Sequence, residues 1–229
     1  MKTSKIIFIS LLGTIALIIL AFVIDVRITG RKNGDNVADF NSSKLILPSF
    51  KVLNLSSCKY IQIIHNDSSF MEINYPKDSI VPNNIYTIAK DTLTISGRNK
   101  KNHLLIIKIH TTDSLKNIKL ENSYLTISDF YFSRMSFDLN HSRLYLNLEN
   151  KDKSSAQAIH IIAKNHSDIN CYKFNIDSLE IILHNSEADF MTHIDKINGS
   201  ITDTSKIVLR QVEGISLKKD VTSKINIYN

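Results

Sequence analysis

Residues 115–229 repeat one pattern of apolar and polar positions six times. In each copy a polar pair ends in serine, and residues that are mostly apolar follow two and four positions later. Alternation of this kind is typical of half-buried strands, and a period near 19 residues is typical of stacked coils. The sequence therefore predicts an all-β, single-stranded β-solenoid (β-helix-like). The serines, separated by 19, 25, 19, 19 and 18 residues, are Ser123, Ser142, Ser167, Ser186, Ser205 and Ser223.

The positions after each serine are expected to point into the core as two columns. They are Leu125/Ile127, Leu144/Leu146, Ile169/Cys171, Ala188/Phe190, Ile207/Leu209 and Ile225/Ile227. Four copies also carry a large apolar residue five positions before the serine, at Ile118, Phe137, Ile162 and Ile181. Because Cys171 stands in an inward column, we expect it to be a buried free thiol. Cys58 lies several coils away, which argues against a disulfide between the two cysteines.

The part of the domain before these coils, residues 45–114, also alternates as strands but with longer and less regular units. A solenoid needs atypical terminal units, because the end of the stack would otherwise expose apolar faces and unpaired backbone. We therefore expect 45–114 to form irregular first coils or a cap, and 115–229 to form regular coils of about 19 residues. The 25-residue interval is expected to hold a polar loop at 150–156.

The amino-terminal segment has a different character, because residues 6–24 are 19 uncharged, mostly apolar residues. As a helix they would span about 28 Å, close to the thickness of a bilayer core. We expect residues 1–30 to be an uncleaved transmembrane signal-anchor with its flanks, with a cleaved signal peptide as the alternative, and 31–44 to be a polar stalk. The chain would then be a single-pass inner-membrane protein with its β domain, 45–229, outside the cytoplasm.

Three features together resemble a known family: residues 50–73 (FKVLNLSSCKYIQIIHNDSSFMEI), the Asp-Thr-Leu-Thr-Ile at 91–95 and the serine-centred coils. They are similar to the auto-transporter adhesin head GIN domain family (DUF2807), which is common in Bacteroidetes. The resemblance implies a right-handed β-solenoid outside the cytoplasm, with no established enzymatic activity. This chain departs from the family in having Asn-Ser or His-Ser, where Gly-Ser is usual.

Charge and motif content argue against several functional classes. The formal net charge is +6, but the lysines and arginines are scattered and form no basic stripe for a phosphate backbone, so we expect no nucleic-acid binding. The carboxylates after Leu115 stand at different phases of the repeat and do not converge on one column. A glycoside hydrolase needs two carboxyl groups close together, and the pattern gives no reason to expect such a pair. No phosphate-binding, dinucleotide or nucleophile motif is present. We therefore expect no enzyme activity and no cofactor.

Histidines and tyrosines are the remaining candidates for chemistry. His141 and His166 directly precede repeat serines, and His184 stands two positions before one, which suits turn residues with positive φ that hydrogen-bond along the stack. No short metal-binding spacing occurs, so we expect no metal site. The binding candidates are Tyr124, Tyr131 and Tyr145, which are expected to face outward and could stack on sugar rings or partner side chains.

The sequence thus favours a non-catalytic module of the cell envelope that presents a β-solenoid face to a protein or glycan. Two alternatives stay open: a carbohydrate-active solenoid enzyme, and a scaffold whose exposed coil ends stack on another subunit. The pattern does not specify the oligomeric state.

Overall fold

The computed structural model describes residues 40–77, 85–97, 105–112, 115–128, 132–147 and 155–228. These residues belong to one compact unit, Phe40–Asn229. Among them, no helix has the length and apolar character needed to cross a membrane. The expected anchor at 6–24 lies outside the described residues, as does most of the expected loop at 150–156.

Strands account for most of the described chain, as the alternating pattern predicts. The strands are β1 (Phe40–Ile46), β2 (Val52–Ser56), β3 (Ile61–His65), β4 (Phe70–Pro76), β5 (Tyr86–Ala89), β6 (Thr92–Ser96), β7 (Ile106–Thr111), β8 (Asn117–Glu121), β9 (Tyr124–Ser128), β10 (Phe132–Asn140), β11 (Arg143–Asn147), β12 (Ser155–Lys164), β13 (Asp168–Tyr172), β14 (Asn175–His184), β15 (Glu187–Met191), β16 (Ile194–Thr202), β17 (Lys206–Arg210), β18 (Val212–Lys219) and β19 (Lys224–Tyr228).

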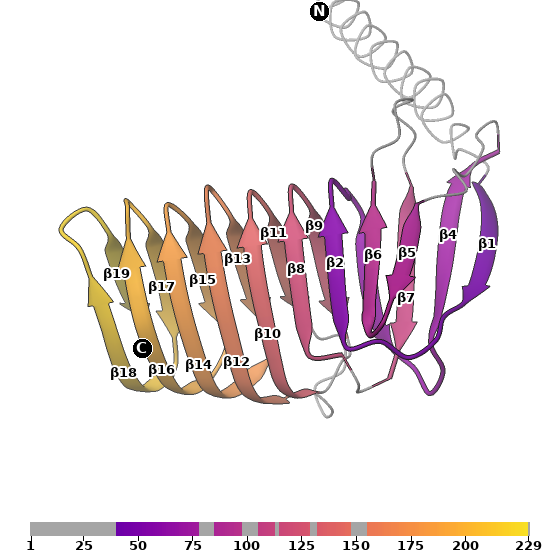
Figure 1. Cartoon of the computed structure of the whole chain (residues 1–229). Helices are drawn as coiled ribbons and strands as arrows, with labels where there is room; N and C mark the ends of the chain where they lie inside the picture. Colours follow the sequence, from indigo (N-terminus) through magenta and orange to yellow (C-terminus); the bar gives the residue numbers. More distant parts are fainter. Residues whose placement is uncertain are drawn as a thin grey trace, which may run out of the picture. The chain divides into compact units, whose positions relative to one another are not determined.

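These strands form two sheets that face each other across the core (Figure 1). Sheet A has the order β1-β4-β7-β3-β9-β11-β13-β15-β17-β19, and sheet B has the order β18-β16-β14-β12-β10-β8-β2-β6-β5. From β8 onward, the chain alternates between the sheets, and each strand pairs in parallel with the strand two further along. One coil is therefore two strands, one in each sheet, and the repeat in the sequence corresponds to one coil.

The amino-terminal end of the stack is built differently. Strands β2 and β3 form a coil next to β8 and β9, but the later coil β6–β7 packs on its outer side, so the order in the stack departs from the order in the chain. Beyond it, β5 pairs antiparallel with β6, and β4 pairs antiparallel with both β7 and β1. Residues 40–44, which the sequence assigns to a stalk, instead begin β1 and pair with β4.

The inward columns contain the residues that the pattern predicts, with one correction. The positions two and four after the serine are buried in the first five copies, and Cys171 is a fully buried free thiol. In the last coil Ile227 is 46% exposed, because β19 is the edge strand of sheet A. The correction concerns the large apolar residue five positions before the serine. Ile118, Phe137 and Ile181 are buried, but Ile162 is only partly buried, and Ile161 pairs with Phe137 and fills the column in its place.

The length of the turn explains this shift. The hydroxyl of Ser142 donates to the carbonyl of Asn140, two residues earlier, whereas the hydroxyl of Ser167 donates to Lys164, three residues earlier. Both residues between Lys164 and Ser167 have positive φ (56° and 62°). One of the extra residues in the 25-residue interval therefore lies in this turn, and counting back from Ser167 gives a position that is wrong by one.

The repeat serines form a hydrogen-bond ladder along one corner of the stack. The N–H of each serine donates to the hydroxyl of the serine in the next coil, at 3.1 to 3.3 Å from Ser123 to Ser205. Cys58 is the first member: its N–H donates to the Ser123 hydroxyl, and its thiol donates to the carbonyl of Ser56. Each buried hydroxyl thus satisfies a donor in one coil and an acceptor in its own turn, which fixes the register between coils.

Replacing one ladder serine is expected to destabilise the domain. Ser167→Ala leaves the buried N–H of Ser142 and the carbonyl of Lys164 without this partner, and the free energy of unfolding should fall by about 1–3 kcal/mol. Urea unfolding of the full chain, followed by circular dichroism, measures the change. The matched control is Ser223→Ala, because the buried Ser223 hydroxyl has no hydrogen-bond partner among the described residues. Equal losses for both variants would contradict the ladder.

Both cysteines are expected to be chemically inert in the folded protein. Burial raises the pKa of the Cys58 thiol and of the Cys171 thiol, so the reactive thiolate is scarce at neutral pH. A chromogenic disulfide reagent should detect no thiol in the native chain and both thiols after unfolding in guanidinium chloride. Rapid reaction of one thiol before unfolding would show that its coil opens locally.

Candidate binding surfaces

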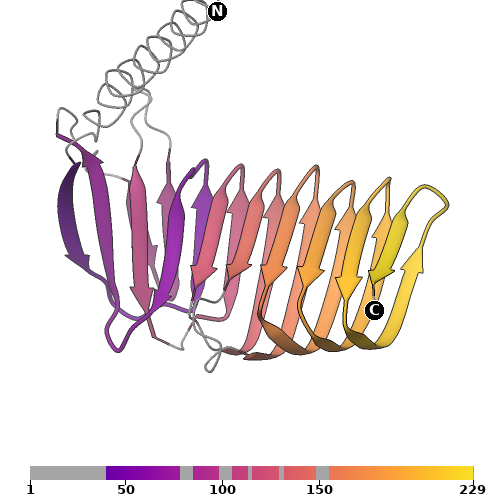
Figure 2. The ribbon, with the colours of Figure 1, turned by 180° about the vertical axis from the view of Figure 1, so that it is seen from behind.

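Three tyrosines from successive coils lie side by side on the outer face of sheet A, and we name them the tyrosine row: Tyr60, Tyr124 and Tyr145. The ring centroids of Tyr124 and Tyr145 are 5.2 Å apart, and those of Tyr60 and Tyr124 are 6.3 Å apart. Tyr124 and Tyr145 face outward because they alternate with inward leucine and isoleucine residues in β9 and β11. Tyr60 directly precedes Ile61, the buried first residue of β3. Figure 2 brings sheet A, which carries this row, to the front.

Positive charge borders the tyrosine row. A hollow of about 380 Å³ lies beside Tyr60 and Tyr124, and its lining includes Lys59, Arg143 and His141. The Nε atom of Arg143 is 3.9 Å from an Oδ atom of Asp168, and the Arg143 side chain is largely exposed, whereas that of Asp168 is partly buried. Burial against its surroundings, with the neighbouring Tyr124 second, raises the pKa of Tyr145, which therefore keeps its hydroxyl proton at neutral pH. This surface offers aromatic faces, hydroxyl groups and two cations.

The sequence and the structure agree only in part on these tyrosines. Tyr124 and Tyr145 lie together on the outer face of sheet A, while Tyr131 lies outside the described residues. The sequence missed Tyr60, because the coil of β2 and β3 has cysteine in place of the repeat serine. Its inward residues, Ile61 and Ile63, also come three and five positions after that cysteine rather than two and four.

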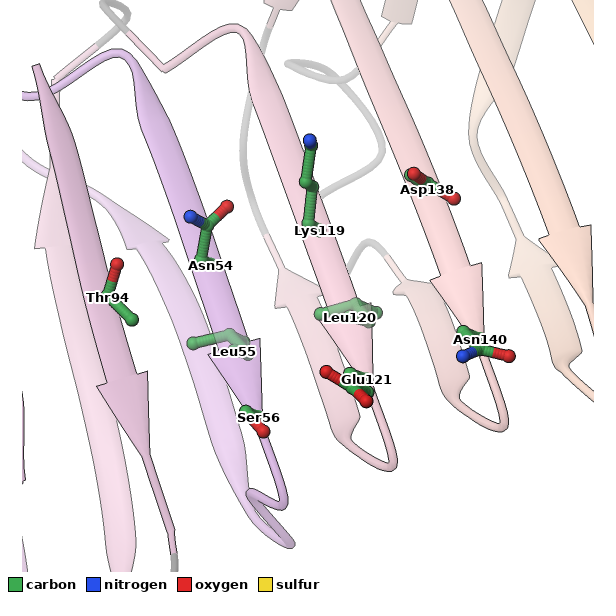
Figure 3. Close-up of a pocket in the computed structure, with 9 residues that line it drawn as sticks. All are labelled: Asn54, Leu55, Ser56, Thr94, Lys119, Leu120, Glu121, Asp138 and Asn140. Carbon is green, nitrogen blue, oxygen red and sulfur yellow. The ribbon is translucent and has the colours of Figure 1, made fainter.

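The opposite face, on sheet B, has a second hollow of about 390 Å³ (Figure 3). Strands β6, β2, β8 and β10 contribute its polar side chains, which include Thr94, Asn54, Lys119, Glu121, Asp138 and Asn140. The Oδ1 atom of Asn54 is buried without a hydrogen-bond partner among the described residues. Because no aromatic side chain lines this hollow, it lacks the stacking surface that the tyrosine row provides.

Two carboxylates line this second hollow, but they stand at different register positions, as the phases of the repeat predict. Glu121 and Asp138 lie on the neighbouring strands β8 and β10, and Lys119 is the register partner of Asp138. Both carboxylates are exposed, so neither is sheltered in the apolar pocket that commonly converts a carboxyl group into a general acid. The arrangement suits hydrogen bonding to a ligand better than catalysis.

Comparisons with known proteins give evidence at the level of the fold. No family model matches the chain, and no curated protein matches it. Three crystal structures described as a "putative adhesin" are similar. The one from Parabacteroides merdae has 12% identity and a TM-score of 0.55, with 84% of this chain and 98% of that chain covered. Those from Parabacteroides distasonis and Bacteroides fragilis have 10% and 12% identity and TM-scores of 0.54 and 0.53. They cover 84% and 83% of this chain, and 98% and 97% of their own. The chain shares the fold of these proteins.

The histidines near the repeat serines have the predicted turn role only in part. His141, His166 and the neighbouring Asn165 have positive φ, and the Nδ2 of Asn165 donates to the Oδ1 of Asn140 at 2.7 Å in the adjacent coil. The rings of His141 and His166 are 6.5 Å apart. His184 differs, since its Nδ1 is 2.7 Å from the hydroxyl of Thr202. His166 and His184 therefore bond to a neighbouring coil, His166 through its Nε2 to the side-chain amide of Asn185 at 3.3 Å, whereas Nδ1 of His141 lies 3.3 Å from Oδ1 of Asn140 in its own turn.

Proposed function

We propose that the chain is a non-catalytic binding module of the cell envelope, and that the tyrosine row binds a glycan with acidic groups. The observation that carries this proposal is the placement of Tyr60, Tyr124 and Tyr145 on three adjacent coils beside Lys59 and Arg143. Aromatic rings stack on the apolar faces of sugars, and the two cations favour carboxylate or sulfate substituents. A chain of sugars that runs along the stack would meet one ring per coil.

The open geometry also favours binding over catalysis. The tyrosine row lies on a sheet face rather than in an enclosed cleft, so it can accept an internal segment of a long polymer. The adhesin description of the three similar structures agrees with a binding role for this chain. An adhesive module requires an exposed rigid face, and parallel coils in fixed register supply one.

The proposal includes how the module is displayed. We infer that the coils wind right-handedly, because parallel strands of one sheet are connected with that hand almost without exception. Residues 6–24 would anchor the chain in the inner membrane as a single-pass protein, with the β domain outside the cytoplasm. The length and apolar character of that segment support this part of the proposal.

Self-stacking at the carboxy-terminal coil is a second candidate function. The large apolar residues Ile215, Ile227 and Tyr228 of β18 and β19 are 43%, 46% and 55% exposed at the end of the stack. Against it, Lys219 stands in a column that Ile201 fills in the preceding coil, and a charge there opposes the approach of a second copy. Analytical ultracentrifugation of the full chain distinguishes the two: a monomer contradicts self-stacking and leaves glycan binding untouched.

Removing one ring of the tyrosine row is expected to weaken glycan binding. Tyr124→Ala removes the central ring, which contacts both neighbours, and the Kd for an acidic oligosaccharide should rise about fivefold or more. Tyr124→Phe keeps the ring and should retain most of the affinity. A glycan array identifies the acidic oligosaccharide, and isothermal titration calorimetry with the full chain measures the change.

The matched control is Tyr228→Ala, since Tyr228 also belongs to sheet A but lies at the far end of the stack. Its Kd should equal that of the unchanged chain. Arg143→Gln should weaken binding of the acidic glycan and leave binding of a neutral analogue unchanged. An array without any signal, or Tyr124→Ala and Tyr228→Ala variants that bind equally well, would overturn the proposal.

A further inference from the structure

Three side chains with metal-binding atoms meet at a corner of the last two coils. His193 lies in the turn between β15 and β16, Asp195 is the second residue of β16, and Glu213 is the second residue of β18. The register pairs on either side, Ile194 with Val212 and Lys196 with Gly214, place Asp195 directly beside Glu213. The local fold therefore brings together two residues that are 18 positions apart.

The distances between the three side chains match a coordination sphere. The Nε2 atom of His193 is 3.0 Å from Oδ1 of Asp195 and 3.6 Å from Oε1 of Glu213. All three ligand atoms lie within 4.8 Å of one another. In a tetrahedral zinc site with bonds of about 2.0–2.1 Å, ligand atoms are separated by about 3.3 Å. The two distances from His193 lie on either side of this value, and the backbone already brings the three side chains within reach of one ion.

The charge at this corner also favours a cation. Asp195 and Glu213 are like charges on neighbouring strands, and the register of β14 with β16 adds Asp177 beside Asp195. Like charges directly opposite each other on adjacent strands are destabilising. Among the described residues, no lysine or arginine forms an ion pair with Asp195 or Glu213, and His193 is their only basic partner. A divalent cation would compensate the negative charge of the three carboxylates Asp177, Asp195 and Glu213.

We propose that His193, Asp195 and Glu213 bind a divalent transition-metal ion of the Zn²⁺ type. One nitrogen and two oxygen ligands suit zinc, and the three side chains are 38%, 45% and 70% exposed, so the ion can enter from solvent and keep a fourth position open. The ion would link β16 to β18 and so hold the edge strand of sheet B onto the stack.

Two other histidine–carboxylate pairs show what makes this corner different. Nδ1 of His160 is 3.0 Å from Oε2 of Glu180, and Nδ1 of His184 is 3.4 Å from Oδ2 of Asp203. Among the described residues, neither pair has a third ligand atom close enough to complete a site. The pair of His160 and Glu180 joins two neighbouring strands, as Asp195 and Glu213 do, and therefore serves as an internal control.

Zinc titration of the full chain tests the proposal. Isothermal titration calorimetry with Zn²⁺ alone should show one equivalent bound per chain with a micromolar Kd. Glu213→Gln keeps the size of the side chain and removes its charge, and it should weaken binding by about tenfold or more. His193→Gln should do the same. Glu180→Gln, the control, should leave the Kd unchanged.

Two further measurements separate a bound metal from a change in folding. Circular dichroism should show the same strand content in all variants, because the exchanged side chains are at least partly exposed. Zn²⁺ should raise the melting temperature of the unchanged chain but not that of Glu213→Gln. The absence of saturable binding below millimolar Zn²⁺, or equal binding by the unchanged chain and both site variants, would overturn the proposal.

The metal site is independent of the proposed function. It lies at the end of the stack formed by β16 and β18, whereas the tyrosine row lies several coils away, on β9 and β11 (Figure 1) and on the residue before β3. The sequence did not predict it, because its ligands come from two coils and lack the short spacing of a metal-binding motif. The only local signal is His-x-Asp at 193–195, followed by glutamate one repeat later.

Discussion

The register between neighbouring coils is the constraint on which the rest of this structure depends. Each coil has only two strands, so it can bury its apolar side chains and satisfy its backbone only through the coils beside it. The parallel ladders provide this along the sheets, and the buried serine hydroxyls provide it at the corner, where the chain turns from sheet B to sheet A. A turn may gain a residue, as before Ser167, provided that its serine returns to the ladder.

This constraint leaves the outward positions free, and they are where function can arise. Residues one repeat apart become neighbours, so a short-range surface such as the tyrosine row is assembled from positions far apart in the chain. Tyr60 and Tyr124 are 64 positions apart in the sequence and yet have ring centroids 6.3 Å apart. The same rule brings Lys59 and Arg143 to one hollow and Asp195 to Glu213. In such a fold the residues of a binding surface come from several coils, and no local sequence motif contains them all.

How far the sequence predicts this structure follows from the same constraint. Where the repeat serine is present, counting forward from it identifies the inward residues correctly, because the ladder sets the start of each strand in sheet A. Counting backward fails at Ile162, since the turn before the serine varies in length. The repeat pattern does not include the coil of β2 and β3, because Cys58 replaces the serine, although the N–H and thiol of Cys58 donate the same two hydrogen bonds as a ladder serine. The outer placement of β6–β7 reverses the order of the coils relative to the chain, and the period of the sequence carries no information about that order.

The two ends of the stack differ in how they cover the apolar side chains and unpaired backbone groups of the terminal strands. At the amino-terminal end the chain reverses direction, and the antiparallel strands β1, β4 and β5 cover the coils with buried residues such as Met71 and Ile73. At the other end, β18 and β19 keep the parallel arrangement, and their inward residues are only half covered. Lys219 in an inward column protects this edge from other strands but adds nothing to the core. The last coil therefore rests mainly on hydrogen bonds, and Asp220 accepts three of them from the N–H groups of Asp203, Thr222 and Ser223. A cation held between β16 and β18 would strengthen the stack at the coil where apolar burial contributes least.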